Sequence, residues 1–427
     1  MPPLTLTSAA ILAALLCSLF PARAQAAAGS EPATPHATVL RAKRIHVSPE
    51  GPPIDDAVVL MRGGRIVAVG PRATVTVPPD ARDLGCDGGT VTAGFQNSHV
   101  HFNGPPYTRA AQQDRATLEA AMAAMLTRHG FTTVVDTASD PRDTVWLRER
   151  TARGELRGPR ILTTGTGIFP PDGLPFYLAG LPAAVRQQMP QPATPEAAQA
   201  AVQANLQRGA DAIKLFVATP QADRSVRLMP AAVARAAADE THRLGKPVMA
   251  HPTDVAGLRA ALDAGVDVLV HTTLGVVEPW PAPLVAQLVE RRTALVPTLK
   301  LWHFELDKAG VPAAVQQRLV GATQQQLKQY ADAGGQILFG TDVGYMTDHD
   351  PADEYRLMAG AGLTPAQILA SLTTAPAARW KEAERRGRVA AGQDADLVVL
   401  GGDPLADPRH FANVRCTVRA GEVLHAK

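Results

Sequence analysis

Short apolar segments alternate with amphipathic segments through the middle of the chain. The amphipathic segments are rich in alanine, show helical periodicity and in several cases end on glycine; they cover residues 120–130, 194–209, 229–245 and 255–265. The apolar runs end in polar residues and number eight: 91–101, 131–138, 160–167, 211–217, 247–252, 266–272, 294–299 and 336–342. Eight strand–helix units predict a parallel (β/α)8 barrel of the α/β class, a TIM barrel, rather than an open sheet.

The two ends of the chain carry a different pattern. Residues 38–70 and 387–424 alternate apolar and polar positions and turn on glycines, which is typical of antiparallel β-structure. They predict one small β domain built from both ends, with the barrel inserted between them. Cys86 and Cys416 fall in these two ends, so a disulfide is conceivable; two buried, unpaired thiols are an equally good interpretation.

The first thirty residues form a separate segment. An apolar run from Ala9 to Phe20 precedes a small, polar stretch with an A-x-A pattern at Ala24–Ala26. The run is too short to cross a bilayer, and the pattern predicts a secretory signal peptide over residues 1–26. We therefore expect a secreted or periplasmic protein that has no membrane partner after cleavage. The alternative is a short N-terminal helix, because neither Lys nor Arg precedes the apolar run.

Composition and charge are those of an ordinary globular enzyme. The chain has 427 residues, of which 46% are hydrophobic, and a formal net charge of +2. This length suits one large barrel with a small additional domain. The chain has no block of basic residues, so we expect no nucleic-acid partner. A homo-oligomer stays an open alternative.

Two histidines end the first predicted barrel strand. His99 and His101 are two residues apart, so their side chains point to the same face of the strand, while Val100 points to the other. Two imidazoles at the carboxyl end of a barrel strand are a natural pair of metal ligands. Taken alone the pattern is weak, because core and surface histidines are common.

Residues of ligand type also occur in four other predicted strands. His251, His271 and Asp342 end the fifth, sixth and eighth runs. Lys214 occupies an inward position of the fourth run, where an unpaired ammonium group would be costly. Because the carboxyl ends of barrel strands meet at one face, these residues together predict one metal centre. Seven further histidines are interpreted as surface residues: His36, His46, His129, His242, His349, His410 and His425.

These motifs together resemble the amidohydrolase superfamily, and most of all its prolidase- and imidazolonepropionase-like members. The resemblance covers nearly the whole chain after residue 26 and is carried by TAGFQNSHVHF, IKLF, AHP, VHTT, FGTD and GRVAAGQDADLVVLGGDP. Ochratoxin-cleaving amidases are similar in their ligand set. The resemblance implies a metal-dependent hydrolase barrel over residues 91–384 and a small β-sandwich domain made of residues 27–90 and 385–427.

The resemblance also implies a ligand set for two divalent metal ions. His99, His101 and Asp342 would hold the more buried ion, and His251 and His271 the second. Histidine and carboxylate ligands favour Zn²⁺, although Mn²⁺, Co²⁺ or Fe²⁺ would fit the same set.

Lys214 matches a lysine that is carbamylated by CO₂ in the binuclear members of the superfamily, where it bridges both metals. An ammonium group cannot bind a cation, whereas a carbamate provides anionic oxygens. By this analogy a metal-bound hydroxide would attack the scissile carbonyl. Asp342 would take up the proton of the attacking water and pass it to the leaving nitrogen. The predicted catalytic residues are Asp342, Lys214 and His303.

The predicted loops after the barrel strands are rich in aromatic residues. Because these loops build the pocket in such a barrel, they favour a small-molecule substrate with an apolar or aromatic portion, although anchoring of long loops is an alternative role. The Pro-rich loop 169–195 predicts a lid, and His303 predicts a hydrogen bond to substrate. The aromatic side chains expected to contact substrate are Phe102, Tyr107, Tyr177, Trp302 and Tyr345.

The leading hypothesis is a secreted amidohydrolase that cleaves an amide or peptide-like C–N bond in a dipeptide or an N-acyl or N-aryl amino acid. One alternative is hydrolysis of an ester, lactone or phosphotriester, since the same centre would activate water for all three. An alternative of another class is a non-catalytic binding protein on the barrel scaffold.

Overall fold

A computed structural model describes residues 36–274 and 279–427. The predicted signal peptide, residues 1–26, lies outside the described residues. None of the helices in residues 36–274 and 279–427 has the length and apolar character needed to cross a membrane.

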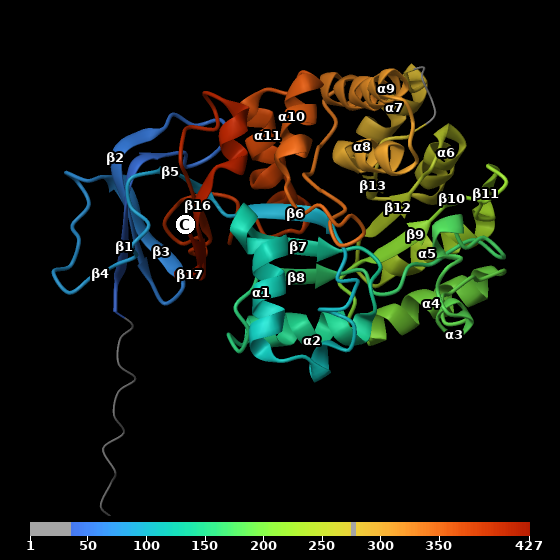
Figure 1. The fold of residues 1–427 in the computed structure, drawn as a ribbon, viewed down its shortest axis with the longest axis horizontal. Helices are drawn as coiled ribbons and strands as arrows, with labels where there is room; N and C mark the ends of the chain where they lie inside the picture. The colour runs from blue at the N-terminus through green and yellow to red at the C-terminus, as the bar shows by residue number, and fades with distance from the viewer. Residues whose placement is uncertain (1–35, 275–278) are drawn as a thin grey trace, which may run out of the picture. The chain divides into compact units, whose positions relative to one another are not determined.

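Parallel strands form the barrel-like part of the structure (Figure 1). Three of them pair in the order β6-β7-β8 and have the bounds β6 (Phe95–Val100), β7 (Phe131–Asp136) and β8 (Arg160–Thr163). Four more pair in the order β14-β13-β12-β9. Their bounds are β9 (Ile213–Phe216), β12 (Val248–His251), β13 (Val268–Val270) and β14 (Ala294–Val296).

Single parallel bridges connect these two sheets in the order of a barrel. They join Ile168 to Leu215, Leu295 to Ile337 and Val100 to Val343. The ladders therefore do not run unbroken round the ring, and the fold is TIM-barrel-like rather than the regular barrel that the sequence predicts. The eighth predicted strand forms only the isolated bridge at Ile337, and it ends at Asp342, which leaves the extended conformation with a φ of 62°.

Helices follow the strands along the chain. Five of them begin at a side-chain N-cap: α1 at Asp114, α2 at Asp140, α4 at Thr194, α6 at Asp254 and α11 at Thr364. The α-helices are α1 (Arg115–Met125), α2 (Pro141–Ala152), α3 (Ala183–Arg186), α4 (Pro195–Gln207), α5 (Ala231–Arg243), α6 (Val255–Ala264), α7 (Ala282–Glu290), α8 (Leu299–Lys308), α9 (Ala313–Asp332), α10 (Ala352–Gly360), α11 (Pro365–Leu372) and α12 (Thr374–Arg379). Short 3₁₀ helices cover Ala110–Gln112, Thr127–His129, Phe176–Leu178 and Pro408–Ala412.

Alternation along the barrel strands separates two hydrophobic cores. Ile213 and Leu215 of β9 belong to the larger core, which packs the strands against the helices. A smaller core contains Met249 and Val270, whose neighbours along β12 and β13 (Ala250 and Leu269) belong to the larger one. Because Lys214 lies between Ile213 and Leu215, its side chain points away from the helices.

Both ends of the chain contribute to one mixed sheet. Its order is β17-β16-β15-β5-β1-β2-β3, and β4 pairs with β1. The antiparallel pairing of β15 with β5 joins the two ends. The strands are β1 (Thr38–Ile45), β2 (Ile54–Arg62), β3 (Arg65–Pro71), β4 (Arg82–Asp83), β5 (Thr90–Ala93), β15 (Leu397–Leu400), β16 (Val414–Arg419) and β17 (Glu422–Ala426).

The strands of both ends pair in one sheet, and the expected β-sandwich is not confirmed. Val399 of β15 belongs to a separate hydrophobic cluster formed by residues of the terminal strands. Its neighbours Val398 and Leu400 belong to the large core of the barrel-like part. Part of the sheet thus packs on the barrel-like part. The alternating pattern of a strand does not specify whether a second sheet or another part of the fold covers its apolar face.

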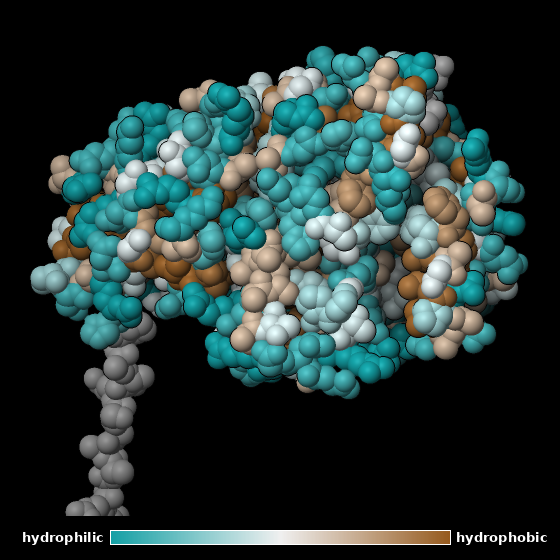
Figure 2. Space-filling model, in the orientation of Figure 1, coloured by the Kyte–Doolittle hydropathy of each residue, from teal (hydrophilic) through white to brown (hydrophobic). Residues whose placement is uncertain are grey.

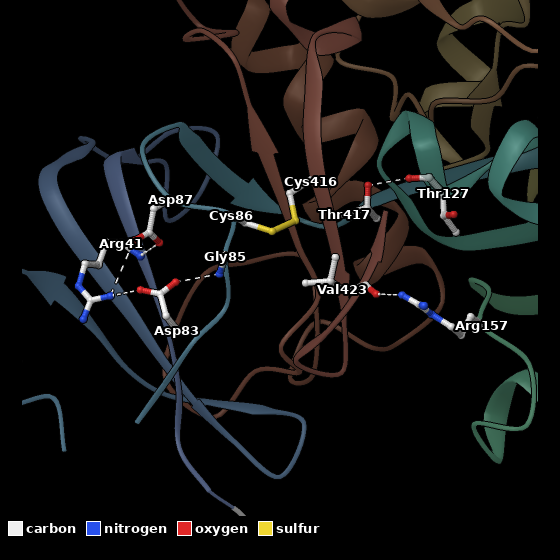
Figure 3. Close-up of a disulfide and its surroundings, with 10 residues drawn as sticks. All are labelled: Arg41, Asp83, Gly85, Cys86, Asp87, Thr127, Arg157, Cys416, Thr417 and Val423. Carbon is white, nitrogen blue, oxygen red and sulfur yellow. Dashed lines mark hydrogen bonds and ion pairs between the residues drawn. A yellow bond between two sulfur atoms is a disulfide. The ribbon is translucent and has the colours of Figure 1, made fainter. Parts of the chain in front are cut away.

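Covalent and polar contacts hold the sheet together and attach it to the barrel-like part. A disulfide joins Cys86 to Cys416 with a Cα–Cα distance of 6.0 Å, which decides between the two interpretations of these cysteines (Figure 3). Thr417 donates from Oγ1 to the carbonyl of Thr127 at 2.6 Å.

His46, predicted at the surface, is only 3% exposed, and its Nε2 is 2.8 Å from Asp403.

Candidate metal centre

Asp342 lies among three of the predicted histidines. Its Oδ1 is 2.9 Å from Nε2 of His101 and 3.3 Å from Nε2 of His99, and its Oδ2 is 3.9 Å from Nε2 of His271. Ligand atoms of His99, His271 and Asp342 all lie within 4.8 Å of one another. This spacing suits a tetrahedral or higher-coordinate divalent ion.

The backbone of the eighth run fixes this arrangement. The N–H of Asp342 donates to the carbonyl of His99 at 2.9 Å, and the N–H of His101 donates to the carbonyl of Val343 at 2.8 Å. Gly344 lies so close to His101 that a Cβ atom there would be 1.8 Å from the His101 carbonyl oxygen. Glycine at 344 is therefore needed for the two segments to meet.

Several residues of the site hold a left-handed backbone conformation. The φ angles are 62° at Asp342, 78° at His271 and 45° at Thr298. Such a conformation costs a non-glycine residue about 1–3 kcal/mol, and it is concentrated at functional sites. In these three residues it turns the chain sharply at the carboxyl end of a strand.

Lys214 and His251 complete the predicted set. The ring of His251 lies 4.8 Å from that of His271 and 5.4 Å from that of Phe216, measured between centroids. Nζ of Lys214 lies 5.0 Å from the centroid of Phe216. Lys214 is 1% exposed, and among the described residues no hydrogen bond or ion pair engages its amine.

Burial controls the protonation of these groups. It lowers the pKa of His99 to about 4 and that of His251 to about 3, so both imidazoles are neutral near pH 7. Burial also lowers the pKa of Lys214 to about 7. Burial alone would raise the pKa of Asp342, but His99 and His101 outweigh it and hold that pKa well below its usual range. Neutral imidazoles around an ionised carboxylate are the form in which such ligands bind metal.

The buried polar atoms fit a bound cation. Oδ1 of Asp342 is buried and has no well-aligned hydrogen-bond partner, although two imidazole nitrogens lie within 3.3 Å. An ionised carboxylate without such a partner is costly in a protein interior unless a cation compensates it.

Three of the predicted aromatic substrate contacts lie near this centre. The Trp302 ring is 5.8 Å from that of His271, and its Nε1 donates to Thr272 at 2.8 Å. Tyr177, from the predicted lid, lies 5.8 Å from Tyr345, which follows Asp342 by three residues. Burial raises the pKa of Tyr177, and the charge of Asp342 contributes to the rise.

Two other predicted contacts lie in the hydrophobic core. Phe102 and Tyr107 are each 3% exposed and pack edge to face with ring centroids 5.0 Å apart. The hydroxyl of Tyr107 faces Met125 of α1, with its oxygen 3.8 Å from the sulfur. The segment after β6 thus folds back onto α1, and these rings serve packing rather than forming a pocket wall.

His303 does not point toward the proposed ligands. It lies on α8 rather than on the predicted loop, and its Nδ1 is 3.0 Å from Asp353. Its side chain is half exposed. Consecutive helical residues point about 100° apart, so Trp302 and His303 face different directions, Trp302 toward Thr272 and His303 toward Asp353.

Sequence reasoning missed two buried polar residues at the site. Asp136 ends β7 and accepts a hydrogen bond from Thr163 at 2.7 Å; its pKa is raised by burial and lowered in part by His101. Asp136 could have been predicted from the sequence, because it ends a barrel strand as the predicted ligands do. Thr298, with Oγ1 2.6 Å from Nδ1 of His271, gave no signal in the sequence.

Comparison with known proteins agrees with this geometry. The sequence profile described as "Amidohydrolase family" matches residues 90–424. The chain belongs to the amidohydrolase family. It is therefore a hydrolase that acts on carbon–nitrogen bonds.

Individual relatives share most of their length with the chain. An uncharacterized protein of Mycobacterium tuberculosis is 28% identical over 384 residues, which are 86% of this chain and 92% of that protein. Ochratoxinase of Aspergillus niger is 24% identical over 352 residues, which are 74% of this chain and 71% of the enzyme.

Solved structures share the fold. A putative prolidase from Bifidobacterium longum superimposes with a TM-score of 0.75 at 26% identity, covering 91% of this chain and 95% of that one. The A. niger ochratoxinase structure superimposes with a TM-score of 0.75 at 19% identity, covering 92% of this chain and 96% of that one.

Proposed function

We propose that the chain is a secreted or periplasmic metal-dependent amidohydrolase that cleaves an amide bond in a dipeptide or in an N-acyl or N-aryl amino acid. The observation that carries this proposal is the convergence of three buried histidines, the partly buried His101, Asp342 and Lys214, which come from different strands of the barrel-like part.

Two divalent metals, most simply Zn²⁺, would be held by the six predicted ligands. The ligand set is His99, His101, Lys214, His251, His271 and Asp342. Reaction of CO₂ with the Lys214 amine would convert it to the carbamate that a metal ligand requires. When bound, the metals would lower the pKa of a water molecule and polarise the substrate carbonyl.

The side chains of the protein would transfer the proton, hold the metals and bind the substrate. Asp342 accepts the proton that the attacking water loses and carries it to the leaving nitrogen. The neutral imidazoles keep their ring nitrogens available as ligands, since burial disfavours their protonation. Trp302, Tyr177 and Tyr345 would bind the apolar or aromatic portion of the substrate.

The substrate class is supported by the relatives rather than by a bound ligand. A prolidase and an ochratoxinase, as named above, share the fold. The alternative, hydrolysis of an ester, lactone or phosphotriester, would use the same centre.

A substrate panel on zinc-loaded protein tests the proposal. We expect turnover of Xaa-Pro dipeptides or N-acyl and N-aryl amino acids, with release of the free amino acid. Faster turnover of lactones or phosphotriesters would favour the alternative reaction. Failure to retain metal after reconstitution would instead favour a non-catalytic binding protein.

A further inference from the structure

A hydrogen bond outside the metal centre fixes the ring of His271. Nδ1 of His271 is 2.6 Å from Oγ1 of Thr298, while Nε2 of the same ring faces Asp342 at 3.9 Å. A neutral imidazole that offers Nε2 to a metal carries its proton on Nδ1. Nδ1–H therefore donates to the hydroxyl of Thr298, which holds both the tautomer and the orientation of the ring.

Thr298 makes this bond in place of capping its own helix. It is the N-cap residue of α8, yet its side chain accepts no hydrogen bond from the first turn. A threonine at this position ordinarily does so, as Thr194 does for α4 and Thr364 for α11. The first turn of α8 consequently needs another acceptor.

Glu354 of α10 provides that acceptor. Its Oε1 and Oε2 accept hydrogen bonds from the N–H groups of Leu299 at 3.1 Å and Lys300 at 2.7 Å. The side chain is fully buried. Burial raises its pKa to about 8, and the hydrogen bonds from Lys300 and Leu299 oppose that shift. The N-terminal end of a helix dipole also favours a carboxylate at this place.

We propose that Glu354 and Thr298 are positioning residues for His271: Glu354 caps α8, and this leaves the Thr298 hydroxyl free to hold the His271 ring toward the metal. The same helix is fastened to the adjoining strand end by a second bond, from Nε1 of Trp302 to Thr272 at 2.8 Å. Helix α8 therefore positions both a proposed metal ligand, His271, and the aromatic ring of Trp302. This inference rests on the metal centre proposed above.

Metal affinity provides the test, because it does not depend on knowing the substrate. Thr298→Val removes the hydroxyl and keeps the branched shape, whereas Thr298→Ser keeps the hydroxyl and loses a methyl. We expect the valine variant to bind Zn²⁺ about 10- to 100-fold more weakly in competition with a chelator, and the serine variant to bind like the wild type. In the Co²⁺-loaded protein, the visible absorption spectrum should change only in the valine variant. Thr298→Ala serves as the second hydroxyl-free variant if the valine variant folds poorly.

Glu354→Gln tests whether the capping of α8 by Glu354 affects the metal centre. The glutamine retains the volume but places an amide NH₂ where one carboxylate oxygen accepted an N–H, so one cap bond is lost. We expect weaker Zn²⁺ binding in this variant, and little further weakening when it is combined with Thr298→Val, since both changes act through one hydroxyl. Asp114→Ala is the matched control: it removes the cap of α1 and should lower Tm without changing Zn²⁺ affinity.

The outcomes separate this inference from the proposed function. A wild-type protein that binds no Zn²⁺ would overturn the metal centre itself. If the wild type binds Zn²⁺ and the hydroxyl-free variants at 298 bind it equally well, the positioning role of Thr298 is wrong. If Glu354→Gln weakens binding as much in the Thr298→Val background as alone, Glu354 does not act through Thr298.

Discussion

At the scale of single residues, the site depends on a few groups whose environment is unfavourable without a metal. Lys214 is buried without a hydrogen-bonding partner in the described part of the chain, and Asp342 combines burial, charge and a left-handed backbone. A buried, ionised carboxylate costs stability, and a bound cation would compensate it, whereas Lys214 would bind a cation only after conversion to the carbamate. Two substitutions probe this balance.

The first substitution is Lys214→Ala. If the lysine carbamate bridges two metals, we expect the metal content to fall below that of the wild type and turnover to drop by at least about 10- to 100-fold. Elemental analysis and steady-state kinetics on the same preparation measure both. Unchanged metal content together with unchanged turnover would contradict the carbamate role.

The second substitution is Gly344→Ala. A methyl group there would be 1.8 Å from the carbonyl oxygen of His101, and the residue has a φ of 97°. We expect a lower Tm and a loss of metal affinity, since His101 or the eighth run must move. Gly310→Ala is the control, because Gly310 has a φ of 64° but open space around its would-be Cβ. It should show only the conformational penalty of about 1–3 kcal/mol. Equal effects of the two changes on metal binding would argue against the close-contact explanation.

At the scale of elements, the loop 169–195 stands out because it brings Tyr177 to the site. Thr219 of β10 (Ala218–Pro220) donates from Oγ1 to the carbonyl of Gly173 at 2.8 Å and so anchors the loop. The loop exposes Phe176 and Val185, although hydrophilic residues predominate on the face drawn in Figure 2. These exposed apolar groups suit the predicted lid.

Thr219→Val is expected to loosen this loop. The change removes one buried hydrogen bond, worth about 1 kcal/mol, and leaves a carbonyl unpaired. We expect faster proteolysis between residues 169 and 195 and a raised KM, with kcat less affected. Thr219→Ser, which keeps the hydroxyl, should resemble the wild type in both assays. A raised KM without faster proteolysis would point to a direct substrate contact instead.

At the scale of the whole molecule, the two ends of the chain stabilise each other. The disulfide between Cys86 and Cys416 spans 330 residues of sequence. Figure 3 shows it beside Thr417 and Val423, which bond to Thr127 and Arg157 of the barrel-like part. Asp403 receives hydrogen bonds from Arg44 at 2.7 Å and from His46 at 2.8 Å, so a turn after β15 is tied to β1.

Replacement of both cysteines by serine should lower the free energy of unfolding by about 2–5 kcal/mol. Without the cross-link, the unfolded chain has more conformational freedom. Turnover at 25 °C should change little, since the site lies on other elements. Denaturant titration with and without reductant measures the effect. Identical unfolding curves for the variant and the oxidised wild type would contradict a stabilising role.

The Asp403 contacts predict a pH dependence. Burial would raise the pKa of Asp403, but hydrogen bonds from Arg44 and His46 outweigh it and lower the pKa below its usual value of 3.8. A depressed carboxyl pKa stabilises the fold above pH 3.8, and this contribution is lost as the pH falls through the folded-state pKa. The difference in unfolding free energy between the wild type and Asp403→Asn should therefore shrink below about pH 4. A constant difference across this range would mean that the charge of Asp403 is not involved.

Local patterns in the sequence determined the strand–helix alternation, the joint β-structure of the two ends, and the positions of six candidate ligands in or at the ends of the barrel strands. Period-two alternation and helix caps act over a few residues, and so they can be read without knowledge of the fold. The eight-unit count gave the barrel order, although not the single bridges that join its two sheets.

Only the tertiary structure decided which groups meet across long distances in sequence. It placed Phe102 and Tyr107 in the core, turned His303 toward Asp353, and paired Cys86 with Cys416. It also brought Thr298 to His271 and Glu354 to the start of α8. Such contacts depend on helix rotation and on packing between separate elements, which no short stretch of sequence encodes.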